Sequence, residues 1–156
     1  MNVLFMCTAN SCRSILSEAM FNHLATPPFV AVSSGSFHKG QVLPQSLTTL
    51  REANIAVDGL HSKGNDAFAD SPPDIVITVC DNAAGEACPV YFGPALKAHW
   101  GLEDPSHVVG DANEVRAAFN ATLAIIERRC RAFLALPFAE LDRERLKREL
   151  DRIGVL

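Results

Sequence analysis

Residues 7–14, with the sequence CTANSCRS, combine a thiol and a guanidinium at a fixed spacing near the start of the chain. A cysteine thiolate is a nucleophile, and the planar guanidinium of Arg13 is suited to gripping two oxygens of a tetrahedral oxyanion. The positive surroundings also favour the thiolate form of Cys7, and the Ser14 hydroxyl can donate a hydrogen bond to its sulfur. The stretch therefore predicts attack by Cys7 on a bound oxyanion.

The flanking segments should hold this stretch as a loop between a strand and a helix. Residues 3–6 are a short apolar run, and apolar side chains recur near the helical period over residues 15–24. At the carboxyl end of a parallel strand, Cys7 would point into the crevice where open α/β sheets bind ligands. The N–H groups of the loop and of the first helical turn would form an anion-binding concavity, with Asn10 in the left-handed conformation. We expect the oxyanion to be bound by Thr8, Ala9, Asn10, Ser11, Cys12, Arg13 and Ser14.

Length, composition and charge place the chain among globular proteins. A length of 156 residues favours a single domain, and 48% hydrophobic with 21% charged residues is ordinary for this class. The net charge of −4 gives no reason to expect a nucleic-acid partner. There is no apolar run of about 18 residues that would span a membrane, and the N-terminus lacks the features of a signal peptide. The sequence therefore predicts a cytoplasmic, reducing location.

The chain has five cysteines, an odd number at irregular spacing, which is unlike a secreted disulfide framework. In a reducing compartment such a set more often indicates catalysis or a metal site. A metal site is disfavoured, because there is no Cys-x2-Cys pair and no histidine at ligand spacing to a cysteine. We expect no metal.

Alternating apolar segments predict the fold. Strands are expected near residues 3–6, 29–34, 74–79 and 96–100, and helices at 15–24, from about 44, at about 111–135 and from about 140. This order predicts an α/β fold with a four-stranded parallel sheet, helices on both faces and right-handed crossovers. We expect one domain over residues 1–136 and a C-terminal helical extension over 137–156, its mixed charges forming a solvated face. The helix from Pro44 should bury Leu47, Leu50 and Ala53.

Three further residues with reactive side chains follow predicted strands. Cys80 comes directly after the strongest strand, so it should lie at the same sheet edge as Cys7. Cys88 follows in a small, polar segment that contains glycine, asparagine and proline. Asp104, in an Asp-Pro pair after the fourth strand, can be a general acid or can simply begin a turn. The two cysteines can likewise be redox-active or simply buried.

The pattern Cys-x5-Arg-Ser after an N-terminal strand resembles the phosphate-binding loop of low-molecular-weight protein tyrosine phosphatases and of the arsenate reductases built on the same fold. Ala9 departs from it, since relatives usually carry glycine there. The resemblance implies that Asp104 is the general acid. Such phosphatases usually place tyrosines after the Asp-Pro pair, whereas Ser106 and His107 follow here, which argues against a phosphotyrosine substrate. Residues 100–105 resemble the reductase version of this loop.

Thioredoxin-coupled arsenate reductases carry two further cysteines after the third strand, as this chain does. The resemblance implies that Cys7 attacks arsenic, that Cys80 then attacks Cys7 to release arsenite, and that Cys88 attacks Cys80 to leave a Cys80–Cys88 disulfide. Seven residues separate Cys80 from Cys88, one more than in such relatives. Packing is the expected role of Cys12, and Cys130 should lie in the core. Some relatives have a monovalent-cation site, to which Asn10, Glu18 and Ser33 would contribute here.

The expected function is reduction of arsenate to arsenite without a bound organic cofactor, with thioredoxin as the partner that restores the thiols. Glutaredoxin with glutathione is an alternative reductant. The second hypothesis is a low-molecular-weight phosphatase that acts on phosphate monoesters through a Cys7 phosphoenzyme. The third is a non-enzymatic oxyanion or redox sensor, which would bind or be oxidised without turnover.

Overall fold

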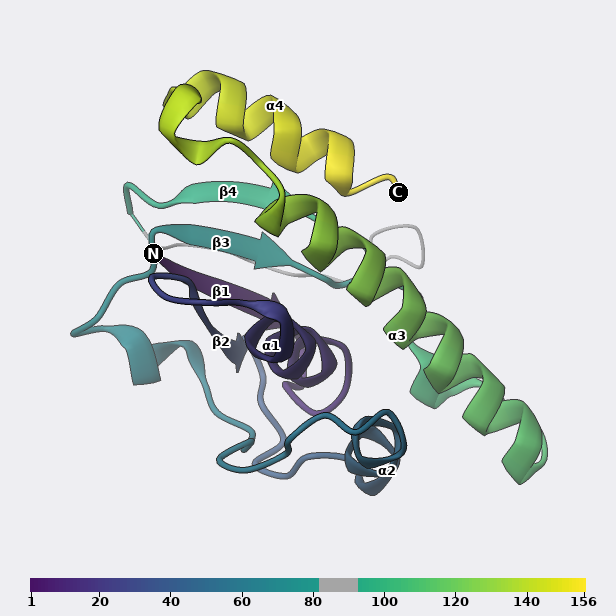
Figure 1. Ribbon diagram of the computed structural model, residues 1–156. Helices are drawn as coiled ribbons and strands as arrows, with labels where there is room; N and C mark the ends of the chain where they lie inside the picture. The colour runs from purple at the N-terminus through teal and green to yellow at the C-terminus, as the bar shows by residue number, and fades with distance from the viewer. Residues whose placement is uncertain (82–92) are drawn as a thin grey trace.

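The computed structural model describes residues 1–81 and 93–156 (Figure 1). Four parallel strands form one sheet in the order β2-β1-β3-β4. The strands are β1 (Asn2–Cys7), β2 (Val30–Gly35), β3 (Ile75–Thr78) and β4 (Leu96–His99). The predicted α/β fold with a four-stranded parallel sheet is therefore confirmed.

The two central strands, β1 and β3, are the most continuously apolar segments of the chain. All four residues of β3 are buried, as are all residues of β1 after Asn2. Central parallel strands are covered on both faces, which explains why they show no alternation of apolar and polar side chains. In the register, Met6 lies beside Thr78 and Cys7 lies beside Gly35. The segments that follow Cys7 and Thr78 therefore leave the sheet at the same edge.

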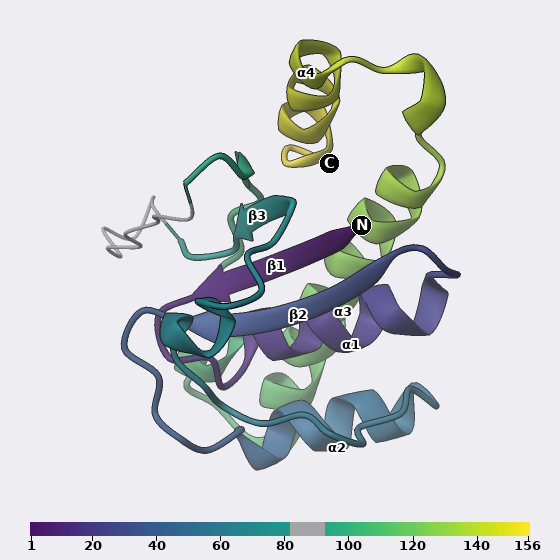
Figure 2. The same ribbon diagram turned by 90° about the vertical axis from the view of Figure 1, so that its left-hand side faces the viewer.

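Two helices cover one face of the sheet. Helix α1 (Arg13–Leu24) and helix α3 (Ala112–Leu134) lie side by side there (Figure 2). The Asp111 side chain begins α3 by accepting a hydrogen bond from the backbone N–H of Glu114 at 2.9 Å. Between these helices and the sheet lies an aromatic cluster formed by Phe5, Phe21, Phe29, Trp100, Phe133 and Phe138.

The opposite face of the sheet has a smaller apolar cluster. Leu4 and Val76 are fully buried there and cluster with Ala95. Phe68, from the short 3₁₀ helix η1 (Asn65–Phe68), packs against them. The larger apolar core therefore lies on the other face of the sheet, which α1 and α3 cover.

Helix α2 (Pro44–Glu52) packs on α1 and α3. The predicted inner face is wrong in part: Leu50 is buried, but Leu47 is only half-buried and Ala53 is exposed. Ser46 and Thr49 are buried instead. Ser46 can be buried because its hydroxyl donates a hydrogen bond to the Ser11 carbonyl at 3.0 Å. A polar residue of α2 thus contacts the loop after β1.

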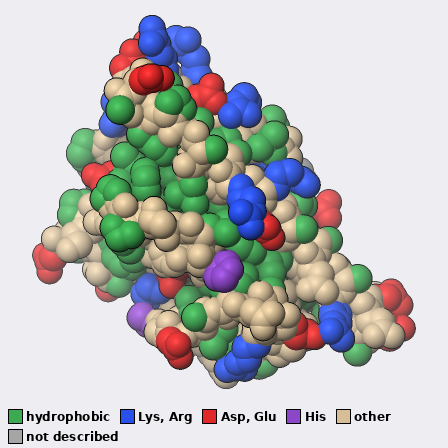
Figure 3. Space-filling view, in the orientation of Figure 1, with side chains coloured by type: hydrophobic (Ala, Val, Ile, Leu, Met, Phe, Trp, Pro, Cys, Tyr) green, Lys and Arg blue, Asp and Glu red, His purple; other side chains and the backbone are tan. Residues whose placement is uncertain are grey.

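Helix α4 (Arg143–Ile153) follows the 3₁₀ helix η4 (Phe138–Glu140) and packs against β4. Leu150 and Ile153 are fully buried in the main core, and the Trp100 indole N–H donates to the Leu150 carbonyl at 2.9 Å. The outward face of α4 carries side chains of both charges (Figure 3), with ion pairs such as Lys147–Asp151. The predicted solvated face of mixed charge is confirmed.

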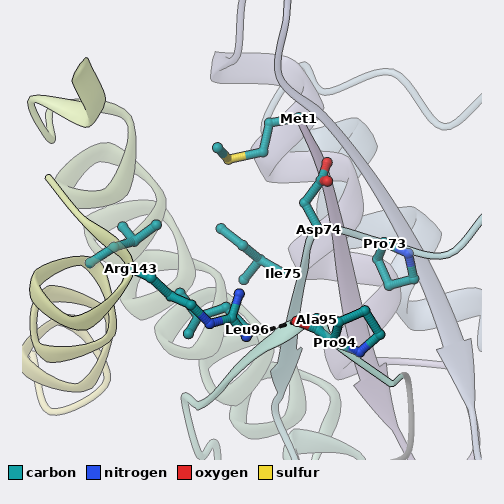
Figure 4. A pocket seen from close by; sticks show the side chains of 9 residues that line it. Met1, Pro73, Asp74, Ile75, Pro94, Ala95, Leu96 and Arg143 are labelled. Atoms are coloured by element: carbon teal, nitrogen blue, oxygen red, sulfur yellow. Dashed lines mark hydrogen bonds between the residues drawn. The ribbon is translucent and has the colours of Figure 1, made fainter.

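A cavity of about 300 Å³ lies where α4 meets the start of β3 and β4 (Figure 4). Arg143 closes one side by donating to the Pro94 carbonyl at 2.7 Å, and the Asp74 carboxylate accepts from the Asn2 N–H at 2.8 Å. The cavity is at the amino ends of the strands, so it is separate from the edge where β1 ends at Cys7. Within residues 1–81 and 93–156, no helix has the length and apolar character needed to cross a membrane.

Candidate active site

Asn10 shapes the loop that joins β1 to α1. Its φ of 49° lies in the left-handed region, as predicted, which costs a non-glycine residue energy unless its surroundings compensate. The side-chain amide donates to Ser14 Oγ at 2.8 Å and to Ser33 Oγ at 3.0 Å, and its oxygen accepts from the Lys63 N–H at 2.9 Å. The buried Asn10 amide thereby ties α1, β2 and the segment before η1 to the loop.

Gly35, the last residue of β2, allows the loop to approach the sheet closely. A Cβ atom at this position would lie 2.6 Å from the Thr8 carbonyl oxygen and 2.9 Å from the Asn10 Cβ. Any side chain here would therefore push the loop away from β2.

The loop carbonyls point toward the segment after β2. Backbone N–H groups of residues 36–43 donate to the carbonyl oxygens of Cys7, Thr8, Ala9 and Ser11 at 2.8–3.1 Å. With its carbonyls turned this way, the loop can direct N–H groups to the side where the Cys7 sulfur lies. The Asn10 N–H does so, at 3.3 Å from Cys7 Sγ. This is the backbone arrangement that an anion-binding concavity needs.

Cys7 is buried at the bottom of this loop, with 2% of its surface exposed. Its Sγ lies 2.9 Å from Ser14 Oγ, and either atom can be the donor. The predicted contact between the Ser14 hydroxyl and the Cys7 sulfur is confirmed. The N–H of Asn10 in the loop and the hydroxyl of Ser14 in the first turn of α1 thus both lie within hydrogen-bond distance of the sulfur.

Arg13 begins α1 and reaches the segment after β4. Its side chain is buried, and Nη1 donates to the Leu102 carbonyl at 3.1 Å while Nη2 lies 3.4 Å from Asp104 Oδ2. The other carboxylate oxygen of Asp104 accepts from the N–H and the hydroxyl of Ser106, at 2.9 and 2.6 Å. Asp104 therefore begins the 3₁₀ helix η3 (Pro105–His107) with one oxygen and meets Arg13 with the other. The structure brings together Arg13 and Asp104, which are 91 residues apart in sequence.

The described cysteines fall into two groups. Cys7, Cys12 and Cys130 are free thiols, and burial raises the pKa of both Cys12 and Cys130 to about 12. Cys80 is fully buried and disulfide-bonded, with none of these three as its partner. Cys88 lies outside the described residues. The expected core position of Cys130 is confirmed, since it is fully buried on α3.

These raised pKa values predict selective alkylation of the reduced protein. At pH 8, a thiol with a pKa of about 12 is ionised in roughly one molecule in 10,000, and the thiolate is the reactive form. We expect iodoacetamide to leave Cys12 and Cys130 unmodified in the folded protein and to modify both in urea. Peptide mass mapping after a timed reaction measures this. Modification of Cys12 at the same rate in both states would contradict the result.

A chain of polar contacts continues behind the loop. Ser33 Oγ donates to Glu18 Oε1 at 2.8 Å, and Lys63 Nζ lies 3.7 Å from the same oxygen. Asn10, Glu18 and Ser33, considered above for a cation site, are thus brought together, and the Lys63 ammonium supplies a positive charge beside them. Burial lowers the pKa of Lys63, and the Glu18 carboxylate partly opposes this shift. The side chains of Lys63 and Glu18 are each only 13% exposed.

Replacing Lys63 with methionine should destabilise the fold, because the Glu18 carboxylate would lose its cation. A fully buried pair costs about 3–5 kcal/mol when one partner is removed, so we expect about 2 kcal/mol here. The measurement is the free energy of unfolding in urea. Lys39→Met, at an exposed site in the neighbouring loop, is the control and should change little. An equal loss in both variants would contradict a specific role for the ion pair.

The motifs did not identify two charged residues near the site, the half-buried Lys63 and the buried Arg129. Lys63 lies in an irregular segment without periodicity, so no pattern could place it. Arg129 did carry a signal, because it interrupts the apolar stripe of α3 between Ile126 and Phe133. A charged residue on the buried face of a helix needs polar partners, and those of Arg129 are the carbonyls of Trp100 and Gly101.

The chain is similar in sequence to known proteins. Residues 2–150 match the family described as low molecular weight phosphotyrosine protein phosphatase. The arsenate reductase of Halalkalibacterium halodurans is 29% identical over 131 residues, which cover 84% of this chain and 93% of that protein. The arsenate reductase of Staphylococcus xylosus is 32% identical over 104 residues, 67% of this chain and 78% of that protein.

The fold also resembles solved structures. The crystal structure of an arsenate reductase from Archaeoglobus fulgidus superposes with a TM-score of 0.71 at 25% identity, covering 86% of this chain and 99% of that one. The chain therefore belongs to the low molecular weight phosphotyrosine protein phosphatase family, and the relatives named above are arsenate reductases.

Proposed function

We propose that this protein reduces arsenate to arsenite through a relay of cysteine thiols that begins at Cys7. One observation carries the proposal. A buried thiol lies under a loop whose Asn10 N–H is directed at its sulfur, and the guanidinium that begins α1 meets a carboxylate from the segment after β4. The similarity to arsenate reductases supports arsenate as the oxyanion.

In the first step, the Cys7 thiolate attacks the arsenic of arsenate and forms a sulfur–arsenic bond. The loop N–H groups and Arg13 hold the arsenate oxygens, so the positive charge lies where negative charge develops. Asp104 donates a proton to the departing oxygen, which leaves as water. The Asp104 carboxylate is within 3.4 Å of Arg13, which supports its presence beside the bound oxyanion.

In the second step, the Cys80 thiolate attacks Cys7 Sγ and a disulfide forms between them. The electron pair of the sulfur–arsenic bond passes to arsenic, which is reduced from As(V) to As(III) and leaves as arsenite. Cys80 follows β3 by two residues, at the edge where β1 ends at Cys7, and both belong to the same buried cluster. The parallel register of β1 and β3 supports this pairing of thiols.

In the third step, the Cys88 thiolate attacks Cys80 and releases Cys7, which leaves a Cys80–Cys88 disulfide. Thioredoxin reduces this disulfide and restores the thiols, with glutaredoxin and glutathione as the alternative. Cys88 lies outside the described residues, so the support comes from Cys7 and Cys80. Cys80 is disulfide-bonded while Cys7 is free, which is the state expected at the end of this relay.

The alternative within the same family is hydrolysis of a phosphate monoester through a Cys7 phosphoenzyme. The loop and Arg13 suit phosphate as well as arsenate, because the two anions have the same shape and charge. Phosphatases of this family usually carry tyrosines after the Asp-Pro pair to flank an aromatic substrate, whereas this chain has Ser106 and His107 there. In addition, hydrolysis makes no use of a second thiol such as Cys80. These two features favour reduction.

A single turnover tests the proposal. Fully reduced protein receives one equivalent of arsenate without any other reductant, and arsenite and the disulfides are then measured by arsenic speciation and peptide mass mapping. We expect one equivalent of arsenite together with a Cys80–Cys88 bond. No arsenite and five intact thiols, in protein that still hydrolyses an aryl phosphate, would refute the reductase and support the phosphatase.

A further inference from the structure

Arg129 is a buried cation on the face of α3 that packs toward the sheet. Only 7% of its surface is exposed, and its Nη1 donates to the Trp100 carbonyl at 3.0 Å and to the Gly101 carbonyl at 3.1 Å. Both carbonyls belong to the segment that leads from β4 to Asp104. Arg129 therefore holds the start of that segment, which we call the acid loop (residues 100–104).

The surroundings of Arg129 are unfavourable for a charge. In the part of the chain that the structure describes, its guanidinium forms no ion pair with a carboxylate, and its Nε is buried without a hydrogen-bond partner. Burial and the neighbouring Arg128 lower the pKa of Arg129. A buried cation compensated by two carbonyl dipoles costs stability relative to an apolar residue of similar size. Core packing therefore gives no reason for an arginine at this position.

The acid loop is held by two arginines from different helices. Arg129 of α3 takes the carbonyls of Trp100 and Gly101, and Arg13 of α1 takes the next carbonyl, that of Leu102, together with the Asp104 carboxylate. Three successive carbonyls are thus fixed by guanidinium groups. These contacts fix the backbone of residues 100–102, which in turn sets where Asp104 lies relative to Arg13.

Gly101 is the point at which the acid loop lies against its neighbours. A Cβ atom at this position would lie 2.8 Å from His99 Nε2 and 3.4 Å from the Cys80 carbonyl oxygen. The loop therefore packs directly against the backbone of the second proposed thiol. A shift of the loop at Gly101 would be felt both at Cys80 and at Asp104.

We infer that Arg129 is a positioning residue that holds the acid loop so that Asp104 can deliver its proton to the departing oxygen; this inference rests on the proposed function. Arg129 acts through Asp104 and does not touch the oxyanion. Its loss should lower the rate of the chemical step and leave arsenate binding nearly unchanged, because Arg13 and the loop N–H groups still hold the anion. A general acid contributes about 10²–10⁴-fold to a rate, and misplacement by about 1 Å can cost about 100-fold.

The experiment is a double-mutant cycle on single-turnover arsenite formation, measured over a range of arsenate concentrations. The variants are Arg129→Met, Asp104→Asn and the two combined. Arg129→Met should lower the maximal rate about 10–100-fold without weakening half-saturation, and should add little when Asp104 is already asparagine. Arg129→Lys, which keeps the charge and a donor, should recover part of the rate. Arg128→Met, at the exposed neighbouring position, is the control and should match the wild type.

Multiplicative losses in the double variant would overturn the inference, because they would show that Arg129 does not act through Asp104. An unchanged rate in Arg129→Met would overturn it as well. If Arg129→Met does not fold, as judged by circular dichroism and urea unfolding, the cycle is carried out with Arg129→Lys and the same outcomes decide. If the wild type forms no arsenite, the proposed function fails, and the same cycle on aryl phosphate hydrolysis decides the role of Arg129 separately.

Discussion

Cys7→Ser is expected to abolish arsenite formation completely. Serine keeps the size and the hydrogen bond to Ser14 Oγ, but its oxygen is a weaker nucleophile and cannot form the disulfide that takes up the oxidising equivalents. Loss of a catalytic nucleophile lowers kcat by the order of 10⁶, and here no route remains for the electrons. The measurement is arsenite per protein in a single turnover, followed for many times the half-life of the wild-type reaction.

Cys130→Ala is the matched control, because it removes another buried thiol, on α3, that has no part in the proposed relay. It should cost some stability and retain the full stoichiometry of arsenite. Both variants must show the urea unfolding of a folded protein for the comparison to hold. Arsenite from Cys7→Ser at the wild-type amount would show that another thiol attacks arsenic, and it would refute the relay at its first step.

Arg13→Lys is expected to lower kcat/KM for arsenate by about 100–1,000-fold, although the charge is retained. Lysine presents a single ammonium, whereas the guanidinium can bind two oxygens in one plane. The buried Arg13 side chain also reaches the Leu102 carbonyl and Asp104 at the same time, through Nη1 and Nη2. One ammonium cannot reproduce both contacts together with a grip on the anion, so both anion binding and the placement of Asp104 should suffer.

The effect is measured as the dependence of the single-turnover rate on arsenate concentration. Arg128→Lys on α3 is the control, since it makes the same chemical change at an exposed position. We expect a raised half-saturation together with a lower maximal rate for Arg13→Lys, and no change for the control. Wild-type rates for Arg13→Lys would mean that the loop N–H groups alone hold the oxyanion.

The sheet and the loop at Cys7 could be predicted because their signals are local. Continuous apolar runs marked β1 and β3, and parallel strands must end at one edge, so the common edge for Cys7 and Cys80 followed from chain order. The left-handed Asn10 was predictable from its residue type, since short polar side chains tolerate that region. The position of Asp104 at this edge followed from its place after the fourth strand.

The interactions across the molecule were not predictable in the same way. Lys63 meets Glu18 only because η1 is preceded by an extended segment that passes the loop, and no periodic pattern indicates such a path. The predicted inner face of α2 was wrong in part. The Ser46 hydroxyl donates to a carbonyl of the loop, so a polar residue takes a buried position that hydrophobicity would assign to an apolar one. Such contacts depend on which distant carbonyl is available.

Trp100 is the only tryptophan of the chain, and its surroundings have a practical consequence. Its indole is buried among phenylalanine rings and donates to the carbonyl of Leu150, and Trp100 is the first residue of the acid loop that leads to Asp104. An indole in such an apolar pocket fluoresces at shorter wavelength than one in water. Intrinsic fluorescence therefore reports on a single place, where the C-terminal helix, the aromatic core and the segment beside the thiols meet, without any attached dye.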